Sequence, residues 1–288
     1  MASIATQESV VVPPRPQIRA RRVAWGRVLL IGIVLAYLGV LILWPLLAVL
    51  QGAFAEGVGR FFVELSQPEL RRAFWLTLVL AAGAVVANGI FGTIVAWVLV
   101  RQNFRGRSFL NGIVDLPFVV SPVIAGYMVL LLFGRTGWFG SLVEATGFRV
   151  VFSWPGMLLV TVFVSLPFIV REIMPVLQEV GVEPELTAYT LGASGWQTFW
   201  RVTLPNIRWG LLYGLTLTLA RALGEFGAVL VVGGAISGRT ETATLYIFGA
   251  LEERQYTGAY AASVVLGLVS FAVLIGMEQL RRRSEVKR

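Results

Sequence analysis

Three ionisable residues interrupt long apolar stretches of the sequence: Asp115, Arg221 and Glu225. A charged side chain at the centre of a bilayer costs about 2.5–3.5 kcal/mol on insertion scales, so such residues normally face protein or water. Arg221 and Glu225 are four residues apart, and this spacing lets them pair on one face of a helix. Arg221 could help an anion to pass or form a structural ion pair. The structural pair is favoured, because a partnered arginine has much of its charge neutralised.

Other reactive side chains are few. The sequence contains no cysteine and no histidine, which excludes thiol nucleophiles, imidazole bases, disulfides and the usual zinc sites. A membrane-embedded enzyme would need a carboxylate pair, and Asp115 with Glu225 is the pair that the apolar stretches offer. If the chain formed a passage for anions, Asp115 would repel them. We therefore expect Asp115 to be structural or to pair with an arginine.

Three hydroxyl residues precede prolines within apolar stretches. Ser121 comes directly before Pro122, and Thr161 and Ser165 come before Pro167. A proline inside a helix frees a carbonyl, and a neighbouring hydroxyl often satisfies it. The alternative is that these hydroxyls line a passage.

The single lysine, Lys287, is followed by arginine. A P-loop needs Gly-Lys-Ser/Thr to hold phosphates, so this chain cannot be its own ATPase of that kind. If the chain moves a solute across a membrane, the energy would come from a partner or from an ion gradient. An ion-coupled secondary transporter therefore stays as an alternative, although the internal repeats common in such proteins are not evident.

The composition indicates an integral membrane protein. Of the 288 residues 57% are hydrophobic and 14% are charged, with a mean hydropathy of +0.77, whereas soluble domains are roughly 45–50% apolar. The first apolar run is too long for the apolar region of a signal peptide, about 7–15 residues, so we expect it to be retained. Six runs are long enough to span a bilayer as helices: roughly residues 28–50, 73–100, 109–134, 150–170, 209–238 and 255–277. The predicted organisation is a tail (1–27), a transmembrane domain (28–280) and a basic tail (281–288).

The distribution of positive charge predicts the topology. If the N-terminus is cytoplasmic, sixteen arginine and lysine residues fall in cytoplasmic segments and seven on the other side. This bias predicts a multi-pass protein of the cell membrane with both termini in the cytoplasm. The charge is spread over separate loops and forms no single basic patch, so we expect no nucleic-acid partner.

The longest predicted cytoplasmic connection covers residues 171–208. It combines helix-forming residues 183–189, a glycine break at 192–195, and Trp196, Phe199 and Trp200 at helical spacing. The pattern predicts two short helices joined by a turn. The alternative is an amphipathic helix lying among the lipid headgroups, where tryptophan is common.

The stretch ELTAYTLGASGWQTFWRVTLPNI within this connection resembles the EAA loop of ABC-importer permeases. That loop reads Glu-Ala-Ala, three residues, Gly, nine residues, Ile-x-Leu-Pro. Gly192, Leu204 and Pro205 stand at matching positions, and Val202 replaces the isoleucine. Glu185 stands one residue earlier than the glutamate of the pattern.

Residues 152–177 and 221–248 extend the resemblance over nearly the whole chain from about residue 25. Together the segments resemble the CysW-type permeases of sulfate/thiosulfate importers, and molybdate permeases share RALGEFGA. The resemblance implies an all-α, type I importer permease with six transmembrane helices and a coupling-helix loop at about 178–208. It implies a CysT-like second permease, a dimer of a CysA-like ATPase that binds ATP and Mg²⁺, and a periplasmic or extracellular sulfate-binding protein. This chain itself would bind no cofactor.

The resemblance also implies which residues contact or serve the ATPase: Glu185, Leu186, Ala188, Leu191, Gly192, Ala193, Gly195, Trp196 and Phe199. The candidate passage or gating residues are Ser121, Thr161, Ser165, Arg221 and Glu225. Sulfate, thiosulfate, molybdate and tungstate stay open as cargo, because all are tetrahedral dianions. The second permease is either a paralogue or another copy of this chain.

Overall fold

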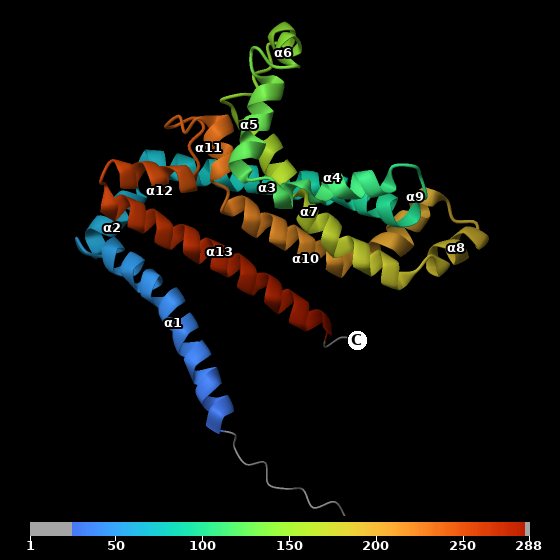
Figure 1. Ribbon diagram of the computed structural model, residues 1–288, viewed down its shortest axis with the longest axis horizontal. Coiled ribbons are helices and arrows are strands. Elements are labelled where there is room, and N and C mark those ends of the chain that lie inside the picture. The colour runs from blue at the N-terminus through green and yellow to red at the C-terminus, as the bar shows by residue number, and fades with distance from the viewer. Residues whose placement is uncertain (1–24, 286–288) are drawn as a thin grey trace, which may run out of the picture. The chain divides into compact units, whose positions relative to one another are not determined.

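The structure is a computed structural model that describes residues 25–285, and every regular element in that range is helical (Figure 1). Residues 1–24 and 286–288, which belong to the two predicted tails, lie outside the described range. The chain divides into two compact units, one ending at Leu47 and one beginning at Ala48. The all-α prediction is confirmed.

The first unit contains most of α1 (Trp25–Ala53). Its residues from Val28 onward are apolar on every side, with no charged side chain up to Ala53. A helix that is apolar all round is suited to lipid or to a protein interior. The first predicted run is therefore a helix of spanning length.

The second unit contains the remaining helices. Their bounds are α2 Val58–Leu65, α3 Pro68–Arg101, α4 Arg107–Val119, α5 Pro122–Phe133, α6 Gly140–Thr146, α7 Trp154–Val180, α8 Glu183–Thr190, α9 Gly195–Thr198, the π-helical turn η1 Phe199–Thr203, α10 Leu204–Leu223, α11 Gly227–Gly233, α12 Ala243–Glu252 and α13 Tyr256–Glu285.

Four described helices are each long and apolar enough to cross a membrane: α1, α3, α7 and α13. Two bent pairs add candidates. One pair is α4 with α5, and the other is the continuous helix Gly195–Leu223 with α11. The described range therefore holds four such spans, or six if each bent pair crosses once. All six predicted runs overlap one of these candidates.

The predicted run 109–134 is not one straight helix. It is broken between Val119 and Pro122, and the two axes differ by 116°. Pro122 has no N–H to continue the helical ladder, and its ring disfavours a helical conformation for Ser121, which has φ −58° and ψ 140°. The run is thus corrected to a bent pair.

The predicted run 209–238 is also broken, with a bend of 59° between α10 and α11. Glu225, which we expected inside a helix, lies in the break. Its carboxylate Oε1 accepts the Ala228 N–H at 3.0 Å and so satisfies a free donor in the first turn of α11. A side chain that satisfies helix-end donors stabilises a break at this position.

The predicted run 150–170 is displaced. The helix α7 begins at Trp154, after Ser153, and continues to Val180. Arg171, taken as the start of a cytoplasmic loop, lies inside α7, and its guanidinium group pairs with Asp115. The connection predicted over 171–208 is therefore mostly helical, and its non-helical residues are Gly181–Val182 and Leu191–Ser194.

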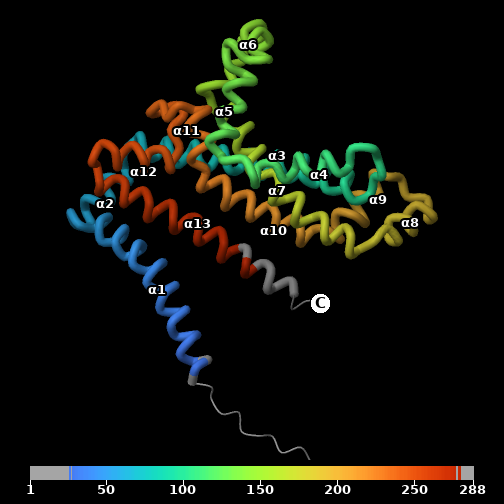
Figure 2. Tube along the Cα trace, viewed as in Figure 1, coloured from blue at the N-terminus to red at the C-terminus, as the bar shows by residue number. Residues whose placement is uncertain are grey.

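The helices α3, α7 and α10 pack against one another and form the centre of the second unit (Figure 2). Ile169 of α7 lies between two glycines. A Cβ atom at Gly92 of α3 would lie 2.6 Å from Ile169 Cγ2, and one at Gly214 of α10 would lie 2.9 Å from Ile169 Cα. Small residues let helix backbones approach closely where lipid gives no hydrophobic driving force. This close packing joins α3 to α7 and α10, the two helices that precede and follow the α8–α9 segment in the chain.

Candidate functional site

The candidate coupling loop, residues 183–203, contains the two short helices that the sequence predicts. The helix α8 ends in a Schellman motif: Gly192 N–H donates to the Tyr189 carbonyl at 2.9 Å and Ala193 N–H to the Ala188 carbonyl at 3.0 Å. Gly192 has φ +85°, a left-handed conformation that a side chain disfavours. The glycine of the EAA pattern is therefore required by the turn itself.

The second short helix begins with a capping box. The Gln197 N–H donates to Ser194 Oγ at 3.3 Å, and the Ser194 N–H donates to Gln197 Oε1 at 2.9 Å. The helix α9 continues directly through η1 into α10. The reciprocal cap fixes the start of a helix that leads into the packed centre of the second unit.

Three aromatic side chains of this helix form a cluster. The Trp196 ring lies 6.4 Å from Phe199 and 5.4 Å from Trp200, measured between ring centroids. Trp196 is 71% exposed, and Leu191 in the preceding turn is 83% exposed. Large apolar side chains exposed together mark a surface that binds a protein or a membrane.

The predicted coupling residues divide into two groups. Leu186, Leu191, Gly192, Gly195 and Trp196 are exposed, whereas Ala188, Ala193 and Phe199 are half-buried. Glu185 differs from all of them, because its carboxylate points into the chain and pairs with Arg101 Nε at 2.9 Å. The apolar pattern of the loop gave no indication of Arg101, which stands 84 residues earlier.

The Arg221 and Glu225 side chains form the ion pair that their spacing predicts. Arg221 Nη1 lies 2.6 Å from Glu225 Oε2, with 3% of the glutamate side chain exposed and 27% of the arginine. The Glu225 backbone carbonyl accepts the Thr244 hydroxyl at 2.6 Å. The pair and this bond hold the break between α10 and α11 against the start of α12.

Asp115 pairs with an arginine, which is one of the two roles expected for it from the sequence. Arg171 donates from Nε to Asp115 Oδ1 at 2.8 Å and from Nη2 to Asp115 Oδ2 at 2.5 Å. Asn111 Oδ1 accepts a further bond from Arg171 Nη1 at 3.0 Å. A cavity of about 300 Å³ lies beside this group, lined by Leu99, Arg107, Ser108, Asn111, Arg171 and Met174.

The candidate hydroxyls make local bonds. Thr161 Oγ1 donates to the Met157 carbonyl at 2.8 Å and Ser165 Oγ to the Thr161 carbonyl at 2.5 Å, and both side chains are buried. Asn88 of α3 donates to Ser165 Oγ at 2.9 Å. These contacts favour a role in helix packing for Thr161 and Ser165. Ser121 is exposed at the break between α4 and α5.

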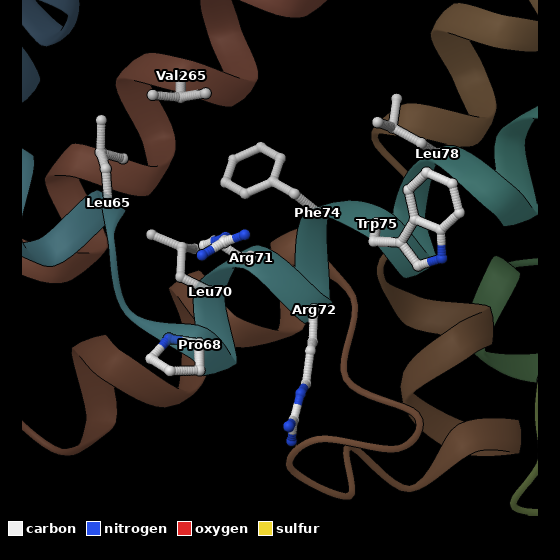
Figure 3. Close-up of a pocket in the computed structure, with 9 residues that line it drawn as sticks. All are labelled: Leu65, Pro68, Leu70, Arg71, Arg72, Phe74, Trp75, Leu78 and Val265. Carbon is white, nitrogen blue, oxygen red and sulfur yellow. The ribbon is translucent and has the colours of Figure 1, made fainter.

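An open groove of about 740 Å³ lies between the start of α3, the end of α2 and α13 (Figure 3). Its walls are mostly apolar, and the guanidinium groups of Arg71 and Arg72 are the charged groups among its lining residues. Trp75 at its edge is 69% exposed. The apolar walls of this groove are suited to an apolar neighbour, and Arg71 and Arg72 supply its charged donors.

Glu241, between α11 and α12, is a carboxylate without an arginine or lysine within 4.0 Å in the described range. Burial raises the pKa of Glu241 above its ordinary value of 4.5, and the nearby carboxylates of Glu69 and Glu253 raise it further. Hydrogen bonds from Ser237 and Gly238 oppose this shift. Among the side chains that the structure describes, no group of three or more His, Cys, Asp or Glu is placed to hold a metal ion.

The family model described as "Binding-protein-dependent transport system inner membrane component" matches residues 88–286. The chain belongs to this family. The match covers the bent pairs, the α8–α9 loop and α13, so all candidate coupling and passage residues of this binding-protein-dependent transport component lie within the matched region.

Similar proteins refine the assignment. This transport component is 48% identical over 255 residues to the sulfate transport system permease protein CysW of Synechococcus elongatus, covering 88% of this chain and 89% of that protein. It is 35% identical over 266 residues to the sulfate transport system permease protein CysT of Escherichia coli K12, covering 92% and 96%. The chain is thus similar to both kinds of sulfate permease.

A solved structure supports the fold. A bacterial alginate ABC transporter, in complex with an alginate pentasaccharide-bound periplasmic protein, contains a chain that superimposes with a TM-score of 0.75. The sequences are 19% identical, and the match covers 90% of this chain and 94% of that one. This transport component therefore shares its fold with a chain of an ABC transporter.

Proposed function

We propose that the chain is a permease subunit of an ATP-driven importer and forms, with a second permease, the translocation path for sulfate or thiosulfate. The observation that carries this proposal is the 48% identity to a sulfate permease over most of both chains. Sulfate is the ion named for both kinds of relative, whereas the case for molybdate rests only on the shared stretch RALGEFGA.

The proposed energy source is an ATPase dimer that binds ATP and Mg²⁺ and docks on the α8–α9 loop. The exposed face formed by Leu186, Leu191 and Trp196 supports docking, because an apolar surface of this kind is buried favourably against another protein. The continuous helix from α9 to α10 would connect an ATPase bound at this loop rigidly to the spans. In this proposal both termini and the α8–α9 loop are cytoplasmic, and a sulfate-binding protein delivers the ion to the opposite side.

The proposed path binds its cargo weakly. Arg171 and Arg221, which lie within described helices, each have a carboxylate partner. A partnered arginine attracts a dianion less strongly than a free one, and a carrier must release what it admits. Selection of the ion then falls mainly to the external binding protein.

The test is uptake of labelled sulfate into vesicles that contain both permeases and the ATPase, with the binding protein outside. We expect uptake that requires ATP, persists when ionophores collapse ion gradients, and falls with excess unlabelled sulfate or thiosulfate. Excess molybdate or tungstate should compete weakly. Uptake driven by an ion gradient without ATP would contradict the proposal, and stronger competition by molybdate would replace sulfate with molybdate as the cargo.

The topology has its own test. Because the chain has no cysteine, single cysteines at Arg105 and Arg254, both exposed, can be labelled without background. A membrane-impermeant thiol reagent should reach Arg254→Cys from outside intact cells and reach Arg105→Cys only after lysis. Labelling of both from the same side would contradict the proposed orientation.

A further inference from the structure

Arg101 is the last residue of a long helix, α3, yet only 6% of its side chain is exposed. Besides its pair with Glu185, it donates from Nη1 to the Leu177 carbonyl at 3.0 Å and from Nη2 to the Gly181 carbonyl at 2.6 Å. These carbonyls belong to the C-terminal end of α7, where helix carbonyls lack intrahelical partners and a positive charge is favourable. One guanidinium therefore joins the ends of α3 and α7.

The second oxygen of Glu185 extends the connection. Glu185 Oε1 accepts the Thr203 hydroxyl at 2.8 Å, and Thr203 is 3% exposed at the end of η1, directly before α10. A single carboxylate, 12% exposed, thus joins α8 to the end of α3 and to the start of α10. We call Arg101, Glu185 and Thr203 the loop clamp.

The backbone beside α8 would not hold this helix by itself. Gly181 precedes α8 with φ +70° and Gly192 follows it with φ +85°. Neither glycine has a side chain that packs against the rest of the chain, so these two connections by themselves contribute little to holding α8 in place. No residue of α8 itself is fully buried. The loop clamp is therefore the main polar tie between α8 and the three packed helices.

We propose that Arg101 is a positioning residue that makes the α8–α9 loop move as one body with the ends of α3, α7 and α10. A force on the exposed face of the loop then reaches the spans and is not absorbed by movement of α8 alone. Glu185 acts inside the chain in this scheme, in contrast to the exposed residues that contact the ATPase. The inference rests on the proposed function, because it assigns how that loop transmits the ATPase movement.

The first test measures the position of α8 in the full-length chain without any transport assay. Spin labels on Ile94→Cys in α3 and Thr190→Cys in α8, both exposed in a chain free of cysteine, report the distance between the two helices. We expect a narrow distance distribution in the otherwise unchanged chain and a broad one when Arg101→Met or Glu185→Gln is added. Arg135→Met is the matched control, because Arg135 is 93% exposed in a surface pair with Glu144.

The second test measures coupling in the assembled transporter. Arg101→Met should still co-purify with the ATPase, because the exposed docking face is unchanged, but it should import fewer ions for each ATP hydrolysed. We expect a loss of at least about tenfold in this ratio, within the about 5–150-fold range of ordinary coupling effects. Thr203→Val leaves the ion pair intact and should change the ratio in the same direction by less.

The two tests together decide the inference. A narrow distance distribution in Arg101→Met, or an unchanged ratio of imported ions to ATP, would overturn it. If Arg101→Met does not accumulate in membranes, Glu185→Gln and Thr203→Val are judged by the same two criteria. Failure of the proposed function is distinguishable, because the unaltered transporter would then show no ATP-driven sulfate uptake while the distance measurement would still report on the loop clamp.

Discussion

Two of the glutamate–arginine pairs, Arg221–Glu225 and Arg101–Glu185, connect different parts of the molecule. Arg221 and Glu225 are four residues apart and stabilise one break in one bent helix. Arg101 and Glu185 are 84 residues apart and join α3, α7, α8 and η1. A local pair determines the shape of a single element, whereas a long-range pair determines whether several elements move together.

The difference also decides which pair is visible in the sequence. A spacing of four residues places two side chains on one face of a helix, so the Arg221–Glu225 pair can be predicted from these two residues alone. Nothing in the spacing of Arg101 and Glu185 indicates a contact, and an arginine at the end of an apolar run is ordinarily taken as a topology signal. We therefore expect the two pairs to respond differently to substitution.

The largest expected effect on stability belongs to Arg221. Arg221→Met leaves the Glu225 carboxylate, 3% exposed, without its counter-ion. Breaking a buried pair in this way destabilises a protein by about 3–5 kcal/mol. Glu225→Gln should cost less, because its amide oxygen can still accept the Ala228 N–H. The measurement is the folded yield and the unfolding temperature of the purified chain.

The double variant sharpens this prediction. Arg221→Met with Glu225→Gln should recover stability relative to Arg221→Met alone, because no charge is left unpaired. A well-folded Arg221→Met protein that does not transport would contradict the structural interpretation and favour a passage role for Arg221.

A smaller effect is expected at the start of α9. Ser194→Ala removes the capping box and should destabilise that end of the helix by about 0.5–2 kcal/mol. Hydrogen exchange of the amides of residues 195–199 should become faster while exchange in α7 stays unchanged. Thr190→Ala is the control, since its hydroxyl bonds to the Thr187 carbonyl and caps no N–H group. Equal exchange in Ser194→Ala and the unaltered chain would show that α9 is held by packing alone.

The smallest expected effect concerns Glu241, a carboxylate that lacks the arginine partner of the other two. Because its pKa is raised in the folded state, its protonated form contributes stability below pH 4.5, and this is lost as pH rises through the raised pKa. Glu241→Gln should therefore unfold at a higher temperature than the unaltered chain at pH 7 and at a similar temperature at pH 4. A variant that is less stable at pH 7 would contradict this explanation.

Much of the fold follows from apolar patterning. Four of the six apolar runs form single helices of spanning length and two form bent pairs, and the two short helices around the glycines at 192–195 and the pairing of Arg221 with Glu225 also appear in the structure. These features depend on local sequence, where length, helical spacing and glycine conformations carry the information.

The remaining features depend on contacts between distant residues or on the competition between two local effects. Hydropathy averages over Ser121–Pro122 and over Gly224–Phe226, so it does not show that the helices bend there. An arginine after an apolar run predicts the end of a span, and the sequence does not show that Arg171 pairs with Asp115, which is 56 residues away. The contacts of Arg101 and Thr203 with Glu185 could not be predicted for the same reason. The roles of the candidate coupling and passage residues stay predictions.

The most direct test of the account is whether the α8–α9 loop is where the ATPase docks. Gly192→Asp and Gly192→Asn are a matched pair, since both side chains tolerate the left-handed conformation better than most and differ in charge. Gly192→Asp places a charge in the proposed contact, at a cost of about 2–5 kcal/mol for an unpaired interfacial charge. At equal membrane levels, we predict that Gly192→Asp loses co-purification of the ATPase and ATP-driven sulfate uptake, and that Gly192→Asn retains more of both. Normal co-purification and uptake in Gly192→Asp would contradict the account and leave the loop as a helix pair resting on the lipid headgroups.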